Sequence, residues 1–173
     1  MSPIPETIVF APDLKVTTVD DRTATLTGGY VAKWIEHTVL VGGAGYWLVS
    51  PRSDTHLGYA GLLLGWRVAG SDRLNLTARG LLGAGQATIY REVSTLSRVD
   101  FRTPDERQLS PRRVGFTDTF FVAEPEAVLQ LGLTSRVFVN LGGGYRVISA
   151  ERGFGELLRG PTATISVQFR VGD

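Results

Sequence analysis

Alternation of apolar and polar residues, repeated in eight long runs, is the feature that most restricts how this 173-residue chain can fold. Successive side chains of a β-strand point to opposite faces, whereas helical spacing is almost nowhere sustained here. Near the C-terminus, "TATISVQF" places every second residue from Ala163 to Phe169 on one apolar face. The runs predict strands at 9–19, 23–35, 38–50, 56–69, 74–90, 117–134, 137–148 and 158–171.

The connections between these runs alternate in length. Tight turns are expected at 36–37, 70–73 and 135–136 on one rim, and longer loops at 51–55, 91–116 and 149–157 on the other, where only 20–22 is short. An even number of antiparallel strands joined in this way predicts an all-β, eight-stranded up-and-down barrel. We expect one domain over residues 1–173, with a long loop insertion at 91–116. The strands are long enough to cross a bilayer when tilted.

Composition excludes several classes of protein. The formal charge of +1 argues against an electrostatically driven nucleic-acid binder, and the absence of cysteine removes disulfides and thiolate metal sites. His37 and His56 lie at opposite ends of strands, so we expect no metal and no cofactor. No 18-residue apolar run is present, which excludes a transmembrane helix. The start "MSPIPETIVF" lacks a signal peptide, so a cytoplasmic protein and a mature exported form are both open.

Alternation alone does not say which face of the barrel points outward, but three features favour a membrane barrel. The polar faces contain little lysine, and glycine recurs inside the strands, where it permits curvature and leaves room for long side chains. Aromatic residues gather near the strand ends, as interfacial girdles require. The expected girdles are Trp34, Trp66 and Phe169 at the tight-turn rim and Tyr46, Tyr59, Tyr90, Phe120 and Tyr145 at the other.

The segments "LTGGYVAKWIEHTVLVGGAGYWLVSP", "GYAGLLLGWRV" and "GPTATISVQF" resemble small bacterial outer-membrane β-barrels of the OmpA/OmpX kind. The resemblance covers nearly the whole chain and rests on glycine and aromatic patterns. It implies a bacterial outer-membrane location and contact with membrane lipid, and the matching segments contain no catalytic signature. Barrels of this class usually end on an aromatic residue, whereas here Phe169 is followed by four further residues.

Two carboxylates, Glu124 and Glu126, interrupt an apolar run on either side of Pro125. If the apolar neighbours face lipid, both carboxylates point into the lumen and need partners there. The turn near Ser135 predicts that Glu124 lies opposite Arg146 and that Arg79 lies level with Glu126. The expected lumen network comprises Glu124, Glu126, Arg79, Arg146, Lys33, Arg67 and Arg170, with Asp13 and Lys15 added from the first strand.

This network has two interpretations, a plug that fills the lumen and a selective path lined by charges. We favour the plug, because the interior of an eight-stranded barrel is just wide enough for side chains to fill. Pro125 should point outward and coincide with a bulge, because it cannot donate a ladder hydrogen bond.

The long loop at 91–116 is the candidate for binding. Arg112 and Arg113 are suited to lipopolysaccharide phosphates or to an acidic surface of a protein partner, and "TPDE" at 103–106 predicts a short helix. A solvated loop without a binding role accounts for the same composition.

Two other functions are open at this point. A soluble calycin-like barrel would turn Leu62, Leu64, Trp66, Ile165 and Val167 inward around an apolar ligand. A lipid-directed hydrolase would need Ser53, Asp54 and His56 to form a catalytic group, although a turn accounts for these residues without chemistry. We therefore expect a non-enzymatic barrel with a structural, adhesive or binding role.

Overall fold

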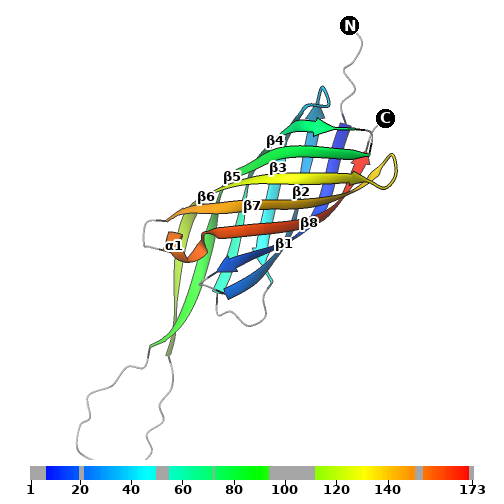
Figure 1. Ribbon diagram of the computed structural model, residues 1–173. Coiled ribbons are helices and arrows are strands. Elements are labelled where there is room, and N and C mark those ends of the chain that lie inside the picture. The colour runs from blue at the N-terminus through cyan, green and yellow to red at the C-terminus, as the bar shows by residue number, and fades with distance from the viewer. Residues whose placement is uncertain are drawn as a thin grey trace, which may run out of the picture.

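The computed structural model describes residues 7–19, 22–49, 55–71, 73–93, 112–150 and 154–171, which form one closed barrel (Figure 1). Its strands are β1 (Thr7–Val19), β2 (Arg22–Ile35), β3 (Val39–Leu48), β4 (Thr55–Gly70), β5 (Leu74–Val93), β6 (Arg112–Gly132), β7 (Val137–Ala150) and β8 (Gly160–Val171). Neighbouring strands are antiparallel, and β1 pairs with β8 to close the sheet. The predicted all-β, eight-stranded up-and-down barrel is confirmed.

The barrel carries apolar side chains on its outer surface, and its lumen contains both an apolar cluster and many polar side chains. In β8, Ile165 and Val167 are exposed, whereas Thr164 and Ser166 are buried. On β4, Trp66 is 59% exposed. A soluble barrel has the opposite arrangement, while a barrel in a membrane presents an apolar surface to lipid tails. The outer surface is therefore suited to hydrocarbon.

Strand β2 contradicts the expected orientation of its side chains. Leu26, Tyr30 and Trp34 face the lumen and are buried, whereas Val31 is 61% exposed on the outer surface. Lys33 shares the outer face with Val31, so its predicted place in the lumen network is wrong. The error has a physical cause: the lumen contains an apolar cluster, and the more apolar face of β2 packs into it, so alternation indicates the wrong outward face.

The long-loop end of the barrel contains a short helix, α1 (Phe154–Leu158), which was expected to be loop and the start of the last strand. Leu158 is fully buried in the apolar cluster of the lumen, so this turn of helix helps to fill the barrel mouth. Among the described residues, no helix has the length and hydropathy needed to cross a membrane.

Strands β5 and β6 are longer than predicted and continue together as a two-stranded ribbon beyond the long-loop end (Figure 1). Their ladder reaches the pairs Glu92 with Arg113 and Val93 with Arg112. The expectation that both arginines belong to the loop is therefore wrong, because they are paired within the sheet. Residues 94–111, including the helix expected at 103–106, lie outside the described residues.

The predicted bulge at Pro125 is also wrong. Pro125 points outward, and the β6–β7 ladder skips it and Glu124, but the register is the same on both sides, so no extra residue is inserted. A register shift occurs instead between β4 and β5, at Arg67 to Ala69, beside the tight-turn end.

Candidate functional site

Arg79 of β5 is the centre of a buried charge network in the middle of the lumen. Its Nε donates to Glu126 Oε2 at 2.6 Å, and its Nη2 lies 3.7 Å from Asp13 Oδ2. Arg79 and Glu126 are also direct partners in the β5–β6 ladder. One guanidinium therefore joins β1 to β6 across the lumen.

A second ion pair lies beside the first and joins Lys15 of β1 to Glu124 of β6. Tyr59 donates its hydroxyl to the other oxygen of Glu124 at 3.0 Å. The Lys15 ammonium also lies 4.0 Å from the ring centre of Tyr46, whose hydroxyl donates to Asp13 Oδ2 at 2.6 Å. Tyrosines from β3 and β4 thus connect the two ion pairs into one network.

The uncharged part of the network lies toward the tight-turn end. Tyr30 donates to Gln168 Oε1 at 2.6 Å, and the Asn140 amide donates to Tyr30 and to Ser166, each at 3.1 Å. Arg79 lies over the Tyr30 ring, with 5.1 Å between the guanidinium carbon and the ring centre. The hydrogen bonds therefore run from the ion pairs to a belt of amides and hydroxyls.

Arg146 does not pair with Glu124 as predicted. Its side chain is fully buried, its Nε donates to the Leu158 carbonyl at 2.8 Å, and its Nη2 donates to the Thr18 carbonyl at 3.3 Å. The ladder register does bring the two positions level, but Lys15 reaches Glu124 across the lumen and takes the pair. Arg146 instead ties β7 to the end of α1 and to β1.

The charges in the middle of the lumen balance among the described residues. Three carboxylates face three cations there: Asp13, Glu124 and Glu126, with Lys15, Arg79 and Arg146. Buried charges are tolerated when they are paired and hydrogen-bonded. The arrangement is suited to closing the barrel and holding its strands in register.

Arg67 and Arg170, which were also predicted for the network, lie apart from it. Both side chains point inward but sit at the tight-turn mouth, half-buried, and neither has an ion pair within the described part of the chain. Each guanidinium instead lies over an aromatic ring, Arg67 over Trp34 at 5.0 Å and Arg170 over Phe138 at 4.6 Å.

The predicted aromatic girdles are only partly right. Trp66, Tyr145 and Phe169 lie on the outer surface, and Phe169 stacks on Phe10 with 4.9 Å between ring centres. The other described members face the lumen: Trp34, Tyr46, Tyr59 and Phe120. The tyrosines turn inward because their hydroxyls donate to buried carboxylates. Alternation in β3 and β4 predicts this role only after the face that points outward has been identified. The Tyr90 side chain lies outside the described residues.

The outer surface also carries aromatic residues that sequence reasoning missed, Trp47 and Phe121. The soluble calycin-like alternative is wrong, because the residues proposed to line its pocket face outward: Leu62, Leu64, Trp66, Ile165 and Val167.

The proposed hydrolase group is not assembled by the described residues. His56 is exposed near the long-loop rim, whereas Ser53 and Asp54 lie outside the described residues, as do the side chains of Arg112 and Arg113. Within the described ranges, no group of three or more histidines and carboxylates is placed to hold a metal ion.

Solved structures with the same architecture cover nearly the whole chain. The N-terminal β-barrel domain of Pseudomonas aeruginosa OprF matches with a TM-score of 0.60 and 13% identity, over 95% of this chain and 97% of that chain. Neisserial surface protein A matches with a TM-score of 0.56 and 11% identity, over 97% of both chains. The fold is that of a small transmembrane β-barrel.

The attachment invasion locus protein Ail of Yersinia pestis has the same fold, with a TM-score of 0.55 and 12% identity over 96% of this chain and 99% of that one. No model of a known protein family matches the chain, and no curated protein sequence is similar to it. The resemblance of the sequence to small eight-stranded outer-membrane barrels is thus confirmed at the level of fold.

Proposed function

We propose that this protein is a non-enzymatic barrel of a bacterial outer membrane whose lumen is closed by the Asp13–Lys15–Arg79–Glu124–Glu126 network. The observation that carries the proposal is the division of side chains between the two surfaces. Charged groups in the middle of the described strands point inward, where two ion pairs form, while the outer surface carries mainly leucine, isoleucine, valine and aromatic side chains. This division fits lipid outside and a side-chain plug inside.

Closure of the lumen is tested by conductance in planar bilayers. The wild-type protein should give no discrete current steps, because its middle section is filled. A Lys15→Ala/Glu124→Ala variant removes both long side chains of one ion pair together, so it leaves no buried charge unpaired. It should admit water and pass current. Lys33→Ala, on the outer face, is the matched control and should stay silent. Discrete wild-type steps, equal in size to those of the double variant, would contradict closure.

The β5–β6 ribbon favours a binding role at the long-loop end. It carries the chain away from the barrel, and its ladder continues to Val93 and Arg112 (Figure 1). We infer that residues 94–111, which connect the two strands in the sequence, together with Arg112 and Arg113, contact phosphates of lipopolysaccharide or an acidic partner. In support, the similar barrel Ail of Yersinia pestis has been crystallised with a heparin analogue, sucrose octasulfate, which is a polyanion.

The binding role is tested with an Arg112→Ser/Arg113→Ser variant and bilayers that contain lipopolysaccharide. Loss of two positive charges should weaken retention on these bilayers and leave retention on phosphatidylcholine unchanged. Arg159→Ser, next to α1 at the same end of the barrel, is the control. Equal retention of the double variant and the wild type would exclude this use of the ribbon.

The absence of enzymatic activity is a separate part of the proposal. It is supported by the lumen network, in which the buried carboxylates are occupied by cations and tyrosines. Replacing His56 by alanine should leave lipid A and phospholipid unchanged in a mass-spectrometric comparison with the wild type. A product that disappears with His56 would restore the hydrolase hypothesis.

A further inference from the structure

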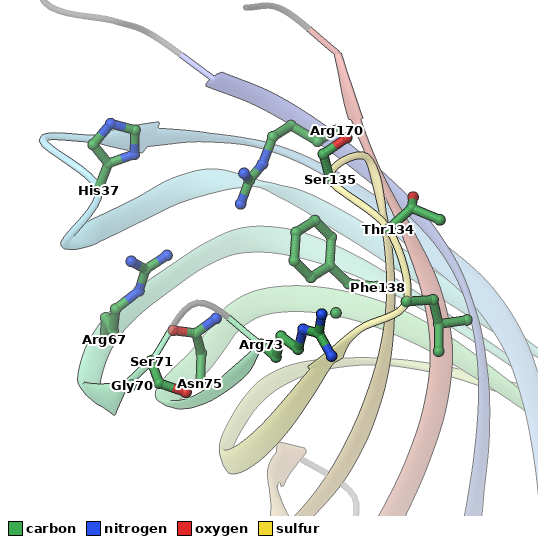
Figure 2. A pocket seen from close by; sticks show the side chains of 12 residues that line it. His37, Arg67, Gly70, Ser71, Arg73, Asn75, Thr134, Ser135, Phe138 and Arg170 are labelled. Carbon is green, nitrogen blue, oxygen red and sulfur yellow. The ribbon is translucent and has the colours of Figure 1, made fainter.

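A hollow of about 690 Å³ opens at the tight-turn end of the barrel (Figure 2). Its wall is built from the ends of several strands: His37 comes from the β2–β3 turn, Arg67 and Arg73 from the β4–β5 hairpin, Phe138 from β7 and Arg170 from β8. Figure 2 shows the side chains of Arg67 and Arg170 reaching into the mouth from opposite sides of the barrel. A volume of this size is typical of sites for small molecules.

The hollow is positively charged. Arg67, Arg73 and Arg170 line it, and no carboxylate belongs to its described wall. Glu36, beside His37, is exposed and does not line it, and Asp72 lies outside the described residues. Arg67 is also near enough to Arg170 for their like charges to repel. The mouth therefore concentrates positive charge, and the described residues that form it supply no counter-charge.

Two guanidinium groups of the mouth are held in place by aromatic rings, and their Nε–H groups do not donate a hydrogen bond within the described residues. The Nε atoms of Arg67 and Arg170 and Trp34 Nε1 are buried and have no hydrogen-bond acceptor among the described residues, as is also the case for Nη2 of Arg79 and Nη1 of Arg146 deeper in the lumen. The guanidinium planes are held against rings, Arg67 over Trp34 and Arg170 over Phe138. Stacking fixes a guanidinium by its face and leaves its N–H edge available for an acceptor. Buried donors in proteins normally have a hydrogen-bond partner. The unpaired donors of the mouth therefore indicate that a bound ligand supplies the acceptor.

Inward of the hollow lies a belt of hydrogen-bonded polar side chains. Phe138 is buried and pairs with Gln168 in the ladder, and one step further in lies the pair Asn140 and Ser166. These polar residues hydrogen-bond with one another and with Tyr30, which closes the lumen below the mouth. A ligand that enters from the tight-turn side therefore stops against this belt.

We propose that the tight-turn mouth is a binding site for a phosphate-bearing ligand, held by Arg67 and Arg170 and closed at its edge by Arg73. Guanidinium groups match the geometry of phosphate oxygens and donate two parallel hydrogen bonds to them. The phosphate would take up the unused Nε donors and separate two like charges. The carboxylates of the middle section are no substitute, because Arg79 and Lys15 already occupy them. The site does not depend on whether the lumen conducts.

Trp34 provides a reporter for the experiment, because Arg67 stacks on it. In a Trp47→Phe/Trp66→Phe background, which removes the two outer tryptophans, Trp34 is the only tryptophan left. The full chain, folded in zwitterionic detergent, is titrated with pyrophosphate at constant ionic strength. We expect a saturable change in Trp34 fluorescence, confirmed by calorimetry on the unaltered protein.

Variants separate a built site from general attraction to positive charge. Arg67→Gln and Arg170→Gln should each weaken pyrophosphate binding at least tenfold, and Arg73→Gln, which is exposed and should not disturb folding, by about threefold. Arg159→Gln at the opposite end of the barrel is the control and should bind like the wild type. An absent or unsaturable pyrophosphate response, or equal losses in Arg159→Gln and Arg73→Gln, would overturn the proposal.

The source of the phosphate is distinguished by reconstitution. If the natural ligand is a lipid headgroup, vesicles containing phosphatidylglycerol should prevent pyrophosphate from binding, whereas phosphatidylcholine vesicles should not. If the ligand is a soluble phosphate compound, pyrophosphate should bind equally in both kinds of vesicle. Either result requires Arg67 and Arg170 and supports the site.

Discussion

The middle of the lumen and its tight-turn mouth both contain arginines that point inward, yet their surroundings differ. In the middle, Arg79 contacts two carboxylates and is nearly inaccessible to solvent. At the mouth, Arg67 and Arg170 rest on aromatic rings, with no carboxylate in the described wall. The comparison teaches that an inward cation is not by itself a functional residue. We propose that cations paired with carboxylates close the barrel, whereas those without a carboxylate partner among the described residues bind a ligand.

Removing one partner from the middle should have the largest effect. Glu126→Gln takes away the closest acceptor of Arg79 and leaves a buried cation partly unpaired. We expect the free energy of unfolding to fall by about 3–5 kcal/mol. Arg170→Gln, at the mouth, should change it by less than about 1 kcal/mol. Urea unfolding of both variants in lipid vesicles measures the difference, and equal losses would erase the distinction between the two regions.

The tyrosines of the middle section should contribute next. Tyr46→Phe removes a hydrogen bond to the buried Asp13 carboxylate, and hydrogen bonds to charged groups are worth about 1.5–3 kcal/mol. Tyr145→Phe, on the outer surface, should be within about 0.5 kcal/mol of the wild type. The same unfolding measurement applies. A Tyr46→Phe variant as stable as Tyr145→Phe would mean that the network does not need its tyrosines.

Two adjacent glycines of β7 test how closely the middle is packed. A Cβ at Gly142 would collide with the Glu126 carboxylate, whereas a Cβ at Gly143 would have nothing within 4 Å. Gly142→Ala should therefore destabilise the barrel by about 1–3 kcal/mol, as overpacking does. Gly143→Ala should be neutral or slightly stabilising. If the two variants unfold at the same urea concentration, Gly142 is not making room for Glu126.

Sequence alone predicted the strands well, because period-two alternation sustained over long runs is characteristic of β-strands and incompatible with helical spacing. It also placed Arg79 level with Glu126, since hairpin turns fix the register of neighbouring strands. Contacts across the lumen could not be obtained in this way. Lys15 lies on β1 and Glu124 on β6, and these two strands are not neighbours in the sheet. Such a contact depends on the stagger of the strands in the closed barrel.

The sequence also did not predict correctly which face of every strand points outward. In β2 the more apolar face, with Leu26 and Trp34, lies in the lumen, so the pattern indicated the wrong face for lipid and Lys33 was assigned to the wrong side. The three-dimensional structure resolves this because Tyr30 needs the lumen amides as hydrogen-bond partners. The helix that ends at Leu158 was not predicted, because a five-residue helix has too few turns to produce a periodic signal.

The most direct test of the whole account uses tryptophan fluorescence in bilayers of brominated phosphatidylcholine, whose bromines quench tryptophans that touch acyl chains. Trp66 is 59% exposed on the outer surface and Trp34 is 3% exposed in the lumen, so variants that keep one tryptophan each compare the two surfaces. We expect strong quenching of Trp66 and little quenching of Trp34. Strong quenching of Trp34 with Trp66 unaffected would mean that the barrel is oriented the other way, with its apolar face inside.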